Sequence, residues 1–83
     1  MTTIEQTICD FLTERVLGEE EMKNLQPETQ LLGSGLINSL TLIHLVTFLE
    51  EEFDFIVTPE EFRGENFSSL RAIAAFVETK TVN

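Results

Sequence analysis

The sequence predicts an all-α fold, a bundle of three long helices and one short helix, formed by residues 1–83 as a single domain. Apolar residues recur at the three- and four-residue spacing that places them on one face of a helix. Residues 55–57 have strand propensity but no second strand to pair with. The 83 residues, 42% of them apolar, suffice for one small core and are too few for two.

The first helix is expected over residues 3–17. Thr2 and Glu5 have the spacing of a capping box, in which each side chain accepts a hydrogen bond from the other residue's backbone N–H. Gly18 is expected to end the helix, because glycine readily adopts the conformation that closes one. The face toward the core consists of residues at i, i+4, i+7, i+8 and i+12: Ile4, Ile8, Phe11, Leu12 and Val16.

Residues 18–38 form a long connection, and loops of this length in small domains are often functional. It begins with the acidic run 19–21 and ends near the sequence Gly-Ser-Gly at 33–35, which predicts a flexible hinge. Its apolar residues are expected to hold it across the end of the bundle: Leu25, Leu31, Leu32, Leu36 and Ile37.

The second long helix is expected over residues 39–53. One face carries apolar residues at i, i+3, i+4, i+7 and i+11: Leu42, Leu45, Val46, Leu49 and Phe53. Leu40, Ile43 and Phe48 widen that face beyond what one buried stripe needs. The helix is therefore either central to the bundle or retains apolar surface for a partner.

Residues 55–57 are expected to be an extended connection. The following Thr-Pro-Glu-Glu, residues 58–61, is typical of a helix start and predicts a short third helix over 59–63, ended by Gly64. A serine cap at Ser68 or Ser69 begins the last helix. Its buried face is expected to consist of Leu70, Ile73, Ala74 and Val77.

Composition excludes several classes of function. Fifteen acidic residues against five Lys and Arg give a net charge of −10. This argues against nucleic-acid binding and against docking on anionic membranes, both of which need positive surface. It favours proteins with basic patches as partners, and a monomer. The single Cys9 excludes an internal disulfide, and without a signal peptide the expected location is the cytoplasm.

No catalytic or metal site is predicted. The chain has one histidine and no HxxxH, CxxC, calcium-loop or phosphate-loop pattern. Ser39 and His44 lie five positions apart on one helix, so they do not face each other, and no acid is placed to orient the histidine. An intrinsic serine enzyme is disfavoured because a nucleophile needs both a base and an oxyanion site.

The informative segment is the start of the second long helix. Two apolar residues after Gly35 lead to Asn38 and Ser39, so the serine hydroxyl is expected at a helix N-terminus. Free backbone N–H groups and the helix dipole favour an anion there, such as a phosphodiester on Ser39. Plain helix capping is the alternative, and by local physics alone it is the more frequent one.

Several stretches together resemble the acyl and peptidyl carrier proteins. They are residues 32–40, 45–46, 49–53 and 56–61. The family's usual Asp-Ser-Leu signature stands here as Asn38, Ser39 and Leu40. The resemblance covers nearly the whole chain, including its size, acidity and helix order. It implies the four-helix fold of that family and a phosphopantetheine arm attached to Ser39, with capping as a compatible second role of this serine.

The resemblance implies a carrier without catalysis of its own. A phosphopantetheinyl transferase moves the arm from coenzyme A to the serine, and the arm's thiol holds an acyl or aminoacyl group as a thioester. An adenylating or other acyl-loading enzyme loads it, and downstream tailoring or condensing enzymes use it. Phenylalanines that could line a cargo pocket are better explained as core: Phe48, Phe62, Phe67 and Phe76.

Departures from the family pattern indicate a subtype. Fatty-acid carriers typically have acids at the second and fifth positions after the serine, where this chain has Thr41 and His44. The predicted docking face is thus nearly neutral, with acidity only at its far end: Leu40, Thr41, His44, Thr47 and Glu51. This favours a discrete peptidyl or aryl carrier of secondary metabolism. Sequence drift and a merely solvated His44 are the alternatives for this face.

Three other functions remain open. The chain could be an acyl carrier of a polyketide or specialised lipid pathway, or a D-alanyl carrier for cell-wall polymers. An unmodified helical adaptor, in which Ser39 is only a cap, belongs to a different class.

Overall fold

The computed structural model describes residues 2–15, 25–32 and 35–81. These residues form three α-helices and one 3-10 helix, and no strand occurs among them. The helices are α1 (Thr3–Arg15), α3 (Ser39–Phe53), η1 (Gly64–Phe67) and α4 (Leu70–Thr81). The predicted all-α class is confirmed for this part of the chain. The predicted set of three long helices and one short helix is not confirmed in that form, because the short helix lies elsewhere.

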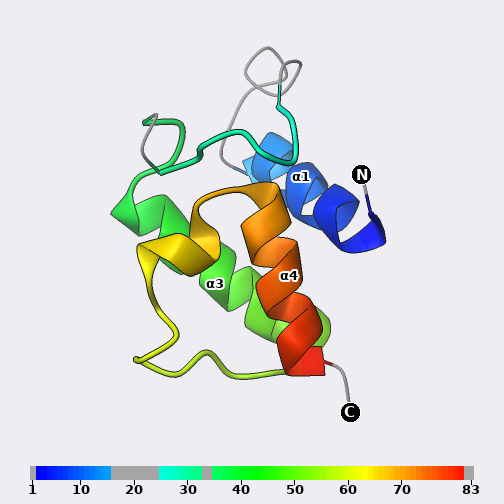
Figure 1. Cartoon of the computed structure of the whole chain (residues 1–83), viewed down its shortest axis with the longest axis vertical. Helices are drawn as coiled ribbons and strands as arrows, with labels where there is room; N and C mark the ends of the chain where they lie inside the picture. The colour runs from blue at the N-terminus through cyan, green and yellow to red at the C-terminus, as the bar shows by residue number, and fades with distance from the viewer. Residues whose placement is uncertain (1, 16–24, 33–34, 82–83) are drawn as a thin grey trace.

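α4 holds the bundle together. It packs against α1, η1 and α3, and Figure 1 shows it crossing in front of α3 with α1 above. The core is apolar, and its fully buried side chains come from every element and from the connection before α3: Phe67, Ile8, Leu12, Leu31, Leu45, Leu49, Leu70, Ile73 and Val77. Burial of these side chains is the main favourable contribution to folding.

The predicted capping box begins α1. The Thr2 N–H donates to Glu5 Oε1 at 2.7 Å, and the Glu5 N–H donates to Thr2 Oγ1 at 3.1 Å. Arg15 is the last helical residue described, so the predicted continuation to residue 17, the buried Val16 and the stop at Gly18 lie outside the described residues.

The described parts of the long connection are held to the core as predicted. Leu25, Leu31 and Ile37 are buried. The Leu31 N–H donates to the Ser68 carbonyl at 2.7 Å, and the Arg71 N–H donates to the Pro27 carbonyl at 2.9 Å. The acidic run 19–21 and the first two hinge residues, 33–34, lie outside the described part. These contacts tie the segment before α3 to the start of α4.

α3 ends where the sequence predicts, at Phe53. Asp54 closes it in the left-handed conformation, with φ 56° and ψ 60°. Glu50 then fixes the extended segment that follows, because its Oε2 accepts a hydrogen bond from the Val57 N–H at 2.9 Å. Residues 55–57 pair with no strand in the described structure, as expected.

The prediction of a short helix over 59–63 is wrong. Residues 59–61 form a turn, and the short helix is η1, which begins at Gly64 instead of ending there. The Phe67 ring reaches the core at the end of η1 and is fully buried. Burial of this ring outweighs the local preference for a helix start at Pro59.

The capping contact predicted for that helix still forms, and it stabilises the turn. Glu61 Oε1 accepts a hydrogen bond from the Thr58 N–H at 3.0 Å. Both Glu61 carboxylate oxygens also accept from Lys80 Nζ of α4, at 2.8 and 3.0 Å. The Lys80 ammonium and the Thr58 backbone lower the pKa of Glu61. The carboxylate therefore stays charged, and the turn tied to α4, at a more acidic pH than an unpaired glutamate allows.

The last helix begins as predicted, and the cap is Ser69. Its Oγ accepts a hydrogen bond from the Ala72 N–H at 3.1 Å. The four predicted residues of the buried face are all buried, and Phe76 joins them. None of the helices in the described ranges is long and apolar enough to cross a membrane.

Candidate functional site

Asn38 prepares the N-terminus of α3. It has extended backbone angles, φ −113° and ψ −176°, and its Oδ1 accepts a hydrogen bond from the Thr41 N–H at 2.9 Å. Its carbonyl accepts from the Leu42 N–H, also at 2.9 Å. Asn38 is therefore the N-cap, and the capping role expected for Ser39 is wrong: Ser39 is the first residue inside the helix.

The Ser39 side chain is consequently available for other chemistry. It is exposed, and no hydrogen bond to a described residue occupies its hydroxyl. The first turn of α3 contains no acidic residue that would repel an anion. The backbone N–H groups of a first helical turn have no partners within the helix, and the helix dipole is positive there. A phosphate ester on Ser39 fits this position.

The segment before Ser39 fixes where the serine lies. Gly35 has φ +84°, a conformation that a residue with a Cβ rarely adopts. Two residues later, Ile37 is buried, and its N–H donates to the Leu31 carbonyl at 3.1 Å. The turn at Gly35 and the anchor at Ile37 set the start of α3 against the core, and they leave Ser39 at the surface.

Replacement of Asn38 tests the cap. Asn38→Ala removes the acceptor of the Thr41 N–H and is expected to lower the free energy of unfolding by about 1 kcal/mol. Asn38→Asp keeps an oxygen in the same place and adds a negative charge at the positive end of the helix. It should therefore be at least as stable as the native chain in urea unfolding at neutral pH. Equal losses for both variants would contradict this assignment.

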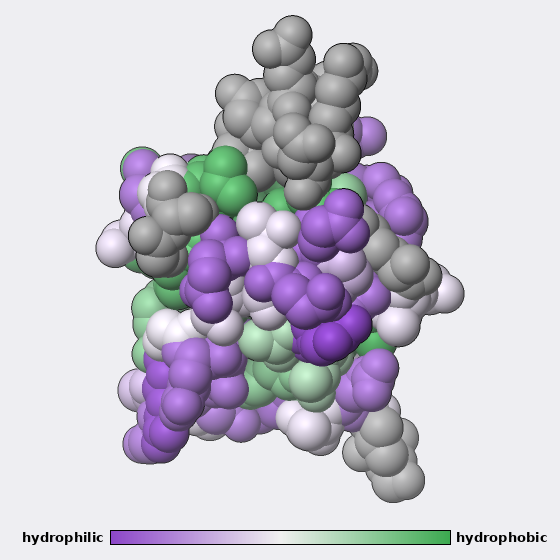
Figure 2. All heavy atoms as spheres, turned by 45° about the horizontal axis from the view of Figure 1, so that its top comes forward, coloured by the Kyte–Doolittle hydropathy of each residue, from purple (hydrophilic) through white to green (hydrophobic). Residues whose placement is uncertain are grey.

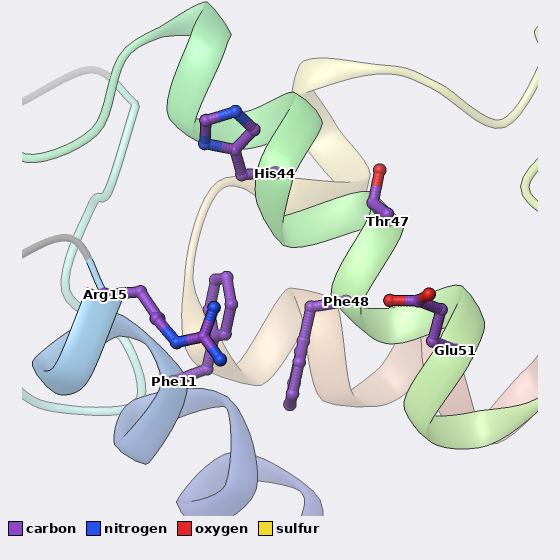
Figure 3. A pocket seen from close by; sticks show the side chains of 6 residues that line it. All are labelled: Phe11, Arg15, His44, Thr47, Phe48 and Glu51. Atoms are coloured by element: carbon purple, nitrogen blue, oxygen red, sulfur yellow. The ribbon is translucent and has the colours of Figure 1, made fainter.

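The structure brings three of the five predicted docking residues together and leaves the other two apart from them. His44, Thr47 and Glu51 are exposed on α3 and line one groove between α3 and α1. Leu40 is 62% exposed but does not line the groove, and Thr41 is half-buried, with its N–H engaged by the cap. The groove has a volume of about 440 Å³. Figure 3 shows the side chains that line it.

The sequence did not indicate the other side of this groove. Phe11 and Arg15 of α1 and Phe48 of α3 complete its lining. The rings of Phe11 and Phe48 stack with centroids 4.3 Å apart and an interplanar angle of 20°. Both phenylalanines were predicted as core, and both are only half-buried. Helical periodicity places each on an inner face but cannot show that the two faces meet at a groove.

The other three phenylalanines that could line a cargo pocket, and that were predicted as core, differ in their burial. Phe67 and Phe76 are buried with their ring centroids 5.4 Å apart, so their prediction as core is confirmed. Phe62 packs on Phe67 but is 42% exposed. On the face shown in Figure 2, hydrophilic side chains predominate and apolar ones gather in small patches between them.

Neither Cys9 nor the acidic side chains form a second site within the described residues. Cys9 is half-buried, and burial raises the pKa of its thiol, so it is a poor nucleophile at neutral pH. Across the described ranges, no three His, Cys, Asp or Glu side chains are grouped to hold a metal ion.

Comparison with known proteins agrees with that geometry. The family model described as phosphopantetheine attachment site matches residues 4–77. The D-alanyl carrier protein of Lactococcus lactis subsp. cremoris strain MG1363 is 30% identical over 78 residues, which cover 94% of this chain and 96% of the relative. The protein of the same name from Lactobacillus delbrueckii subsp. bulgaricus is 32% identical over 66 residues, 80% of this chain and 79% of the relative.

Proposed function

The chain belongs to the family of carrier proteins with a phosphopantetheine attachment site, and from this we propose that Ser39 bears its arm. The prosthetic group of the family is 4′-phosphopantetheine. Two other serines lie in the described residues, and each is engaged: Ser69 Oγ caps α4, and Ser68 Oγ donates to the Glu65 carbonyl. The unoccupied hydroxyl of Ser39 at a helix N-terminus is the observation that supports this proposal.

The attachment reaction requires little from this chain. In the active site of a phosphopantetheinyl transferase, the Ser39 oxygen bonds to the phosphorus that bears the pantetheine group of coenzyme A. The pyrophosphate P–O bond breaks, 3′,5′-ADP leaves, and the hydroxyl proton passes to a base of the transferase. Asn38 and the first turn of α3 hold the serine in place, and the helix N-terminus stabilises the resulting phosphodiester.

When bound, the arm supplies a terminal thiol that carries an acyl group as a thioester. The arm remains covalently attached, so the cargo is presented to successive enzymes at high effective concentration. The carrier role asks for no catalytic residue, in keeping with the proposal that the chain is a substrate of its partners and not an enzyme. Because coenzyme A and ATP supply these reactions, we place the protein in the cytoplasm.

We propose a small amino acid as the cargo, loaded by an adenylating enzyme. In that enzyme a carboxylate oxygen bonds to the α-phosphorus of ATP, the bond between the α- and β-phosphates breaks, and pyrophosphate leaves. AMP then leaves as the acyl carbon bonds to the sulfur of the arm, and the thiol proton passes to solvent. Two observations support an aminoacyl cargo. The relatives are named D-alanyl carriers, and this chain has Thr41 and His44 at the two positions after Ser39 where fatty-acid carriers typically have acids.

The relatives' names favour D-alanine over the secondary-metabolite cargo that the nearly neutral docking face indicated. An acyl cargo of a polyketide or lipid pathway remains the alternative within the same family. A loading experiment distinguishes them. The arm-bearing protein is incubated with ATP and a D-alanine-adenylating enzyme, or with an acyl coenzyme A and an acyltransferase, and its intact mass is measured.

The expected result is a gain of one alanyl group with the adenylating enzyme, removed by mild base as a thioester is. The protein without the arm should gain nothing. A gain only with the acyltransferase would replace the aminoacyl cargo by an acyl one. An arm that accepts neither cargo from active enzymes would contradict the proposed loading while leaving the site of attachment in place.

A further inference from the structure

The groove between α1 and α3 has three chemically distinct parts. Its floor is the stacked pair Phe11 and Phe48. Figure 3 shows Arg15 beside Phe11 at one side of this pair and Glu51 beyond Phe48 at the other. His44 and Thr47 form the remaining wall. The groove therefore offers an apolar surface, a cationic hydrogen-bond donor and an anionic acceptor within one space of about 440 Å³.

A continuous row of exposed residues leads from the attachment site into this groove. Ser39, Ile43, Thr47 and Glu51 are four residues apart, so their side chains form one ridge along α3. All four are exposed, and Ile43 is half exposed despite its apolar side chain. The last two members of the ridge line the groove. A flexible group attached to Ser39 thus has an uninterrupted surface to follow.

The distances suit a tethered occupant. With a rise of about 1.5 Å per helical residue, Thr47 lies ~12 Å and Glu51 ~18 Å along the axis from Ser39. The phosphopantetheine arm has about 14 bonds from the serine oxygen to the sulfur, comparable to nearly five residues of extended chain, or ~16 Å. Along the axis of α3 this length matches the separation between Ser39 and the residues of α3 that line the groove.

We infer that this groove holds the aminoacyl group carried by the arm, an inference that rests on the proposed function. The groove and an aminoacyl thioester are chemically complementary. An aminoacyl thioester presents a carbonyl oxygen, an ammonium group and a small side chain. Arg15 has only donors and suits the carbonyl, Glu51 suits the ammonium, and the phenyl rings suit the side chain.

The opposed charges of Arg15 and Glu51 also define an orientation. Arg15 repels the ammonium, so the amino group is directed toward Glu51 and the carbonyl toward Arg15. An acyl group without an amine lacks the Glu51 contact and is held less well. Docking in the groove shields the thioester from water and gives a small aminoacyl cargo a preferred position on the carrier.

The test compares three stable amide analogues installed on Ser39 by a transferase: D-alanyl, N-acetyl-D-alanyl and propionyl pantetheine. Intact mass first confirms that each arm is attached, which separates a failure of the proposed function from a failure of this inference. Nuclear Overhauser effects between the β-methyl group of each acyl group and the Phe11 and Phe48 ring protons then report docking. They are expected for the D-alanyl form and reduced for the two analogues that lack an ammonium.

Glu51→Gln is expected to lower the docked population by about 1.5- to 5-fold, the range for an exposed ion pair. Glu52→Gln is the matched control, because Glu52 is also exposed but does not line the groove. The inference is overturned if an attached D-alanyl group shows no contact with either ring, or if both substitutions have the same effect. It is also overturned if the groove resonances respond only to an added adenylating enzyme.

Discussion

Ser39→Ala is expected to abolish attachment of the arm completely and to leave the fold intact. Alanine has no oxygen to bond to phosphorus, so no labelled product should form with a fluorescent coenzyme A analogue and an active transferase. The free energy of unfolding should change by less than about 0.5 kcal/mol, because Asn38 and not Ser39 caps α3. Labelling on gels and urea unfolding measure the two effects separately.

Ser68→Ala is the matched control for this experiment. Ser68 is a half-buried serine in the turn before α4, and its Oγ makes one long hydrogen bond of 3.4 Å to the Glu65 carbonyl. This variant should be labelled as fully as the native chain. Continued labelling of Ser39→Ala would show that another residue accepts the arm. A large loss of stability would show that Ser39 has a structural role that the geometry does not indicate.

Phe67→Ala is expected to produce the largest loss of stability, about 3–5 kcal/mol. The ring is fully buried, and its centroid lies 5.4 Å from that of Phe76 and 5.9 Å from that of Phe62. For a chain of this size the total free energy of unfolding is about 4–12 kcal/mol, so the variant should be marginally folded. Urea unfolding at low temperature measures the difference.

The comparison with Phe62→Ala isolates the effect of burial. Phe62 belongs to the same aromatic cluster but is 42% exposed, so its truncation removes less buried surface. We expect a loss less than half as large as for Phe67→Ala. Equal losses would mean that the two rings stabilise η1 as a unit, and that Phe67 does not by itself anchor the segment between α3 and α4.

The sequence predicted the elements whose ends are set by local chemistry. The capping box at Thr2 and the boundaries of α3 followed from residues close together in the chain. The predicted position of the short third helix was wrong because two effects compete in the segment between α3 and α4. The helix-start pattern at 58–61 does make its capping contact, but burial of Phe67 determines where the helical turn forms. Such long-range burial is not visible in a local pattern.

The residues of the candidate site were likewise predicted where they lie close together in the sequence and missed where they come from another helix. Ser39 and its neighbours were identified from a contiguous signature, although the capping role fell to Asn38. His44, Thr47 and Glu51 were placed on an exposed face by helical periodicity, and the structure brings them together in one groove. Arg15 was missed because it comes from another helix, and its place opposite α3 depends on how α1 packs.

The most direct test of the account is the mass of the native chain before and after incubation with coenzyme A, magnesium and a broad-specificity phosphopantetheinyl transferase. We expect the gain of one phosphopantetheine group per chain, and fragmentation should place it on the peptide that contains Ser39. No gain with several transferases that are active on other carriers would contradict the account. So would an arm located on any other residue.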